Sequence, residues 1–117
     1  AERLVPAMVA PGVTEAARQA ARRIMSAVSP ATYRAALQAL VHFDRRAALP
    51  ALRMPTLCLA AAHDRTAPPE VMQRMAGHIP SAEYVCLPDA GHIANVEQPQ
   101  AFNHAVVQFL DRHFTAP

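Results

Sequence analysis

PTLCLAAAHD (residues 55–64) and EYVCLPDAGH (residues 83–92) are the two stretches that decide how this chain folds. The first opens with a continuous apolar run that is too short for a helix and ends at the polar cluster HDRTAPP. Such a run, bounded by Pro55 and polar residues, favours a buried β-strand. The run EYVCL has the same character, so the sequence predicts two short strands.

A helix is expected after each strand. From Pro69 onward, apolar residues recur at helical spacing as far as Ile79, and Gly77 and Pro80 favour an end to the helix there. After Pro99, a second helical stripe contains Phe102, Ala105, Val106, Phe109 and Leu110. The order strand, helix, strand, helix predicts an α/β fold with two parallel strands joined by a right-handed crossover.

Two polar residues follow the predicted strands. Asp64 lies just beyond the first strand and His92 lies a few residues beyond the second. The carboxyl ends of parallel strands share one edge of the sheet, where α/β proteins place their sites, and adjacent strands are about 4.8 Å apart. We therefore expect the side chains of Asp64 and His92 to meet.

The chemistry of such a pair is proton transfer. An imidazole can accept and return a proton near neutral pH when one ring nitrogen is held in the right tautomer. A carboxylate bonded to Nδ1 of His92 would do this and would stabilise the imidazolium, leaving Nε2 free to deprotonate a nucleophile. Asp64 and His92 are thus the candidate acid and base of a catalytic site.

The stretch MPTLCLAAAHDRTAPPEVMQRMAGHIPSAEYVCLPDAGHIANVEQPQAFNHAVVQFL (residues 54–110) resembles the C-terminal third of the α/β-hydrolases, especially the 3-oxoadipate enol-lactonase and esterase branch. The pair Gly-His at residues 91–92, followed by Glu97, Pro99 and Phe102, is its most specific part. The resemblance implies that Asp64 is the acid and His92 the base of a Ser-Asp-His triad. It also implies a small-molecule ester or enol-lactone substrate and no metal or organic cofactor.

The nucleophile of that family is missing from these residues. It sits in a G-x-S-x-G elbow upstream of the acid, but Ser26, Ser29 and Ser81 lack such flanking glycines and neither cysteine offers a substitute. The segment that forms the oxyanion hole is absent as well. We therefore expect a fragment that is inactive alone, with the N-terminal hydrolase half supplied by the same or a separate chain. A smaller departure is Ala61, because many relatives carry Gly three residues before the acid.

The chain divides into two predicted regions. Residues 1–48 are Ala-rich and predicted to be helical, and their first stretch, AERLVPAMVAPG, resembles the end of a helix. Residues 49–117 are predicted to form the C-terminal βαβα portion of the core. Thr14 can cap one helix, and Ser29 with Pro30 can start another. The segment SPATYRAALQALVHFDRRAAL (residues 29–49) resembles the end of a helical cap and its return to the core. The predicted apolar faces are Ala17, Ala20, Ala21, Ile24 and Val28 in the first helix, and Tyr33, Leu37, Leu40 and Val41 in the second.

Composition argues against several other classes. Hydrophobic residues make up 52% and charged residues 17%, which is typical of a globular domain. The basic residues form no stripe that would suit nucleic acid, and no apolar run approaches the length of a membrane span. Cys58 and Cys86 lie in apolar runs, so we expect buried, unpaired thiols. With no recognisable leader, a cytoplasmic location is expected.

Other readings remain open at this point. The chain could be a non-catalytic interaction module, or a subunit that pairs with a separate N-terminal chain and has an exposed apolar sheet edge. A metal site could be drawn from His42 and Asp44, or from His63, Asp64 and His92, although no typical ligand spacing supports it. Within the resemblance, a carbon-carbon bond hydrolase, a dehalogenase or a cofactor-free haloperoxidase would use the same acid and base. Glu97 is expected to cap a helix, and His113 to favour the negative end of the last helix.

Overall fold

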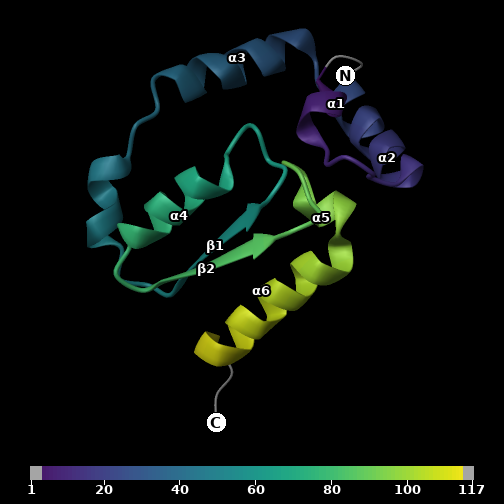
Figure 1. Ribbon diagram of the computed structural model, residues 1–117. Helices are drawn as coiled ribbons and strands as arrows, with labels where there is room; N and C mark the ends of the chain where they lie inside the picture. The colour runs from purple at the N-terminus through teal and green to yellow at the C-terminus, as the bar shows by residue number, and fades with distance from the viewer. Residues whose placement is uncertain (1–3, 115–117) are drawn as a thin grey trace.

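The computed structural model describes residues 4–114 and places two strands between helices. The elements in chain order are α1 (Val5–Met8), α2 (Glu15–Ser26), α3 (Pro30–Val41), the 3₁₀ helix η1 (Arg46–Ala51), β1 (Thr56–Ala61), α4 (Pro69–Gly77), β2 (Ala82–Leu87), α5 (Ala94–Glu97) and α6 (Pro99–Phe114). The strands lie side by side, with α4 on one side of them and α6 on the other (Figure 1). The predicted order of strands and helices is confirmed. The first residues of the first predicted region (1–3) and the last residues of the second (115–117) lie outside the described residues.

The strands form a parallel pair, as the sequence predicts. Thr56 is in register with Ala82 and Ala61 with Leu87. Successive side chains of a strand point to opposite faces, so each face of this sheet needs its own cover. On the α4 face, buried Cys58 packs with Ala76 and Ile79. On the α6 face, the buried residues are Ala61, Leu87, Ala90 and Ala94, and the partly buried Leu59, Val85 and Phe102 pack against them.

The N-terminal helices begin where their sequences predict. The hydroxyl of Thr14 accepts a hydrogen bond from the Ala17 amide at 3.2 Å, and the hydroxyl of Ser29 accepts one from the Thr32 amide at 3.1 Å. These bonds satisfy amide donors that have no partner inside the helix. α1 and α2 then pack near α5, since Val5, Val9 and Ala21 form a buried cluster that Ile93 contacts.

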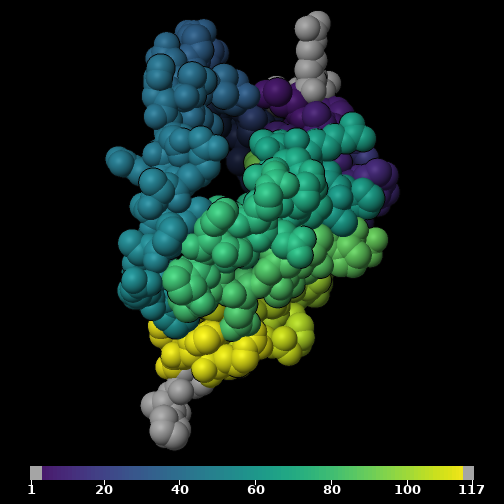
Figure 2. Space-filling model, turned by 60° about the vertical axis from the view of Figure 1, so that its left-hand side comes forward, coloured from purple at the N-terminus to yellow at the C-terminus, as the bar shows by residue number. Residues whose placement is uncertain are grey.

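The apolar faces predicted for the N-terminal helices are only partly covered by the rest of the chain. No residue of α3 is buried, and Leu40 and Val41 are 67% and 79% exposed. In α2 the apolar face is buried at Ala17 and Ala21, but Ile24 is 57% exposed. Figure 2 shows α3 and the segment after it as an arm along one side of the molecule, set off from the body. A groove of about 800 Å³ separates residues such as Phe43 from α4.

The two cysteines differ in how far they are buried. Cys58 is buried as predicted, but the expected burial of Cys86 is wrong: Cys86 is exposed and is not part of the cluster that Cys58 forms with α4. Both cysteines are unpaired.

Between residues 4 and 114, no helix is long and apolar enough to cross a membrane.

Candidate active site

Asp64 lies in a tight turn directly after β1. Its amide donates to the carbonyl of Ala61 at 3.1 Å, which closes the turn. Its Oδ1 accepts hydrogen bonds from the amides of Thr66 at 2.7 Å and Ala67 at 2.9 Å. In the part of the chain that the structure describes, no residue other than glycine has a positive φ, so Ala61 is accommodated without left-handed backbone. The carboxylate is therefore fixed by the backbone of its own loop.

The surroundings of Asp64 favour its ionised form. Burial opposes ionisation, but the hydrogen bonds from the Ala67 amide, His92 and the Thr66 amide together outweigh it and lower the pKa of Asp64. The side chain is only 10% exposed. An acceptor-only carboxylate is thus presented at the end of β1.

His92 meets Asp64 across the carboxyl edge of the sheet, as the sequence predicts. Its Nδ1 lies 3.0 Å from Oδ2 of Asp64, and its side chain is 34% exposed. Because an ionised carboxylate can only accept, the proton of the neutral ring belongs on Nδ1. Nε2 then keeps its lone pair, and within the described residues it makes no hydrogen bond. This is the arrangement that a general base requires.

The backbone around His92 is held at a very short distance from the N-terminal segment. The His92 amide donates to the carbonyl of Met8 at 2.7 Å. A Cβ built on Gly91 would lie 2.6 Å from that carbonyl oxygen and 2.8 Å from the Ala10 nitrogen. Real Cβ atoms do not approach backbone atoms so closely, so only glycine allows this contact. Gly91 is therefore needed for close approach.

Glu97 has a role that sequence analysis missed. It is 8% exposed, and instead of capping a helix it accepts hydrogen bonds from two backbone amides of separate segments. Its Oε2 lies 2.6 Å from the Ala10 nitrogen and its Oε1 lies 3.1 Å from the Gly91 nitrogen. Apart from histidines, Glu97 is the only charged residue between Asp89 and Asp111. That isolation in an otherwise uncharged stretch was the available signal of burial.

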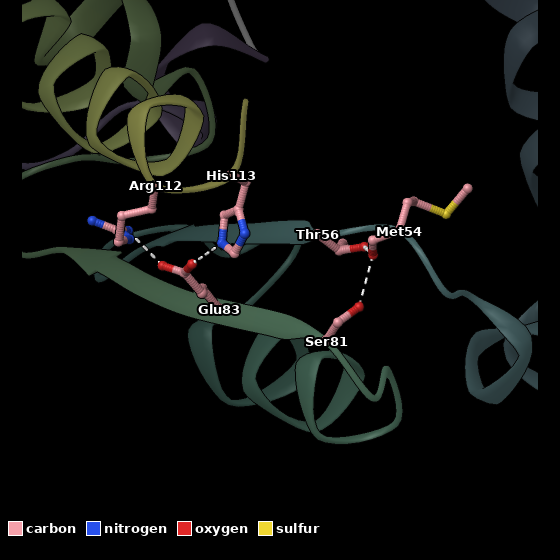
Figure 3. A network of polar contacts seen from close by, with 6 residues as sticks. All are labelled: Met54, Thr56, Ser81, Glu83, Arg112 and His113. Carbon is pink, nitrogen blue, oxygen red and sulfur yellow. Dashed lines mark hydrogen bonds and ion pairs between the residues drawn. The ribbon is translucent and has the colours of Figure 1, made fainter. Parts of the chain in front are cut away.

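A second carboxylate–histidine contact lies at the amino end of β2 (Figure 3). Glu83 binds both Arg112 and His113 of α6, with Nε2 of His113 facing one carboxylate oxygen. The hydrogen bond to Arg112, together with that to His113, lowers the pKa of Glu83. His113 also lies against Phe109, with ring centroids 4.8 Å apart. His113 thus has a specific side-chain partner in addition to its place near the helix end.

The other candidate ligands do not gather around a centre. Among residues 4–114, no group of three or more His, Cys, Asp or Glu side chains is placed to hold a metal ion. Asp44 instead pairs with Arg46 at 2.6 Å, and hydrogen bonds from Arg46 lower the pKa of Asp44 to about 2. Of the three residues in the other candidate metal set, only Asp64 and His92 bond to each other through their side chains.

A pocket of about 320 Å³ next to Asp64 is lined by Arg18, His63 and Arg65 among others.

Comparison with known proteins shows the family of this chain. A family model described as the alpha/beta hydrolase fold matches residues 4–99. The 3-oxoadipate enol-lactonase 2 of Acinetobacter baylyi is 39% identical over 80 residues, which cover 68% of this chain and 30% of the lactonase. The polyketide synthase ThaQ of Burkholderia thailandensis is 40% identical over 80 residues, covering 68% of this chain and 4% of the synthase.

A solved structure gives the same answer for the fold. The thermophilic esterase from Thermogutta terrifontis superposes with a TM-score of 0.84 at 31% identity, covering 97% of this chain and 43% of the esterase. The chain thus spans less than a third of the lactonase and less than half of the esterase. The predicted resemblance and fold class are confirmed: the chain belongs to the α/β-hydrolase fold family.

Proposed function

We propose that this chain supplies the acid and the base of a hydrolase that acts on a small-molecule ester or enol-lactone through a Ser-Asp-His type triad. Asp64 is the acid and His92 is the base. The nucleophile and the oxyanion donors come from an N-terminal hydrolase half, in the same or a separate chain. Residues 1–48 belong to the cap-like region and residues 49–117 to the core portion of that enzyme.

One observation carries the proposal: Nδ1 of His92 faces Oδ2 of Asp64 at 3.0 Å, while Nε2 is unpaired within the described residues. The esterase and lactonase names among the similar proteins support the substrate class. In the acylation step, Nε2 takes the proton of the nucleophile as it attacks the ester carbonyl carbon. The imidazolium that forms is stabilised by Asp64 and then returns the proton to the leaving oxygen. In the second step a water molecule, deprotonated by Nε2, attacks the acyl-enzyme, and the carboxylic acid product is released as the nucleophile regains its proton.

The proposal is tested on a protein that contains both these residues and the nucleophile, with a chromogenic ester such as p-nitrophenyl acetate. His92→Ala is expected to lower kcat by about 10⁶-fold, because the base and the nucleophile act as a unit. His113→Ala is the matched control, since His113 also contacts a carboxylate, and its kcat should stay near that of the parent protein. Turnover retained in His92→Ala would overturn the assignment. The 117 residues alone are expected to show no hydrolysis.

A further inference from the structure

The carboxylate of Glu97 joins two segments that are far apart in sequence. Ala10 precedes it by 87 residues and Gly91 by six, and both donate a backbone amide to it. The side chain is buried, so neither amide has ready access to water there. A buried amide without an acceptor is costly, which means that both donors depend on the same carboxylate. Each of the two carboxylate oxygens accepts from one of these amides.

The two joined segments are the N-terminal strap (residues 8–10) and the histidine loop (residues 90–92). Besides the two hydrogen bonds of Glu97, the His92 amide donates to the Met8 carbonyl. The strap also lies directly against Gly91, since a Cβ at that position would overlap backbone atoms of Met8 and Ala10. The position of the His92 backbone is therefore set by the strap, and Glu97 is the side chain that attaches the strap to the loop.

The loop is anchored on its other side to the acid loop. The amide of His63 donates to the carbonyl of Ala90 at 2.9 Å, and Ala90 is completely buried. The histidine loop is thus fixed between the strap and the residue that precedes Asp64. Release of the strap would free one side of the loop, and with it the direction in which the His92 ring points.

We propose that Glu97 is a positioning residue that orients the His92 ring toward Asp64 by holding the amides of Ala10 and Gly91 together. The proposal rests on the proposed function of the Asp64 and His92 pair. Glu97 touches neither reacting atom of that pair, so it acts through the backbone. Glu97→Gln keeps the size of the side chain but replaces one acceptor oxygen with an amide donor, which then faces a backbone N–H. One of the two attachments is lost.

The test is the tautomer of neutral His92, read from the ¹⁵N shifts of its imidazole in the 117-residue protein. The wild type is expected to carry its proton on Nδ1 alone. Glu97→Gln should show a mixture of the two tautomers, because the hydrogen bond to Asp64 is no longer enforced. Glu70→Gln is the matched control, since Glu70 is exposed on α4, and it should retain the wild-type spectrum. Glu97→Asp keeps both acceptor oxygens but is one methylene shorter, so it should also show a tautomer mixture, with more of the Nδ1 form than Glu97→Gln.

The outcomes separate this proposal from the proposed function. A folded Glu97→Gln protein with the proton on Nδ1 alone would show that Glu97 only stabilises the fold, and would overturn the positioning role. If Glu97→Gln does not fold, Glu97→Asp decides: a tautomer mixture that is absent from Glu70→Gln supports the proposal, and an unchanged spectrum overturns it. Asp64→Asn tests the pair itself. If that variant leaves the His92 tautomer unchanged, the pairing behind the proposed function fails, whatever Glu97 does.

Discussion

Among residues 4–114 there are two carboxylate–histidine pairs, one at each end of the sheet, and only one of them has the geometry that a catalytic base requires. Asp64 and His92 meet at the carboxyl edge, whereas Glu83 and His113 meet near the amino end of β2. The two contacts look alike as ion pairs. They differ in which ring nitrogen is engaged and in what else holds the carboxylate.

At the carboxyl edge, backbone amides hold Asp64, and the side chain is 10% exposed. Its histidine uses Nδ1 and leaves Nε2 available. At the amino end, Glu83 is 31% exposed and is shared with Arg112, and its histidine uses Nε2. Figure 3 shows this second carboxylate between two side chains of α6. The comparison shows that contact with a carboxylate does not by itself make a base. The proposed base differs from His113 because its carboxylate partner is fixed by backbone amides and because the unpaired ring nitrogen is Nε2.

The two carboxylates are expected to differ most in their effect on turnover. In a protein that also contains the nucleophile, Asp64→Asn is expected to lower kcat by about 10⁴-fold, because the amide can stabilise the wrong tautomer of His92. The matched change at the other pair, Glu83→Gln, should leave kcat within the error of the assay. Steady-state hydrolysis of a chromogenic ester measures both. Equal losses in the two variants would break the distinction between the pairs.

The next largest effect concerns the backbone that holds the base. Gly91→Ala should lower the free energy of unfolding by about 3 kcal/mol, because the added methyl group meets backbone atoms that cannot rotate away. Gly77→Ala is the control, since a Cβ at Gly77 meets nothing within 4 Å. At the end of α4 that change should raise stability by about 0.5 kcal/mol. Urea unfolding of the two variants gives both values. An unchanged free energy of unfolding in Gly91→Ala would mean that the strap is not in close contact with the histidine loop.

Sequence patterns predicted the part of the fold that follows from local rules. The strands, the helices after Pro69 and Pro99, the caps at Thr14 and Ser29 and the meeting of Asp64 with His92 all follow from periodicity, turn chemistry and the geometry of parallel strands. Each of these depends on residues close in sequence, or on the fixed spacing of adjacent strands. This is why the candidate acid and base could be named before their distance was known.

The remaining features depend on contacts between distant segments, which a single sequence does not reveal. Glu97 has the composition of a helix lead-in, and only the approach of the segment around Ala10 turns it into a buried acceptor. Helical periodicity predicts that α3 is a helix with an apolar stripe, but not that a neighbour covers the stripe, and Leu40 is largely exposed. The pairing of Glu83 with His113 was missed for the same reason.

The smallest expected effect is the response of the two pairs to acid and salt. The pKa of each carboxylate is lowered in the folded state, so each stabilises the protein above its unfolded pKa and loses that contribution as pH falls through its folded pKa. The destabilisation caused by Asp64→Asn or Glu83→Gln should therefore shrink between pH 7 and about pH 3. Added salt should remove the effect of Glu83→Gln, since that pair is exposed and screened, while leaving most of the effect of Asp64→Asn, whose partners include backbone amides of its own loop. Unfolding free energies of both variants at low and high salt measure this, and equal salt sensitivity would mean that Asp64 is held by charge alone.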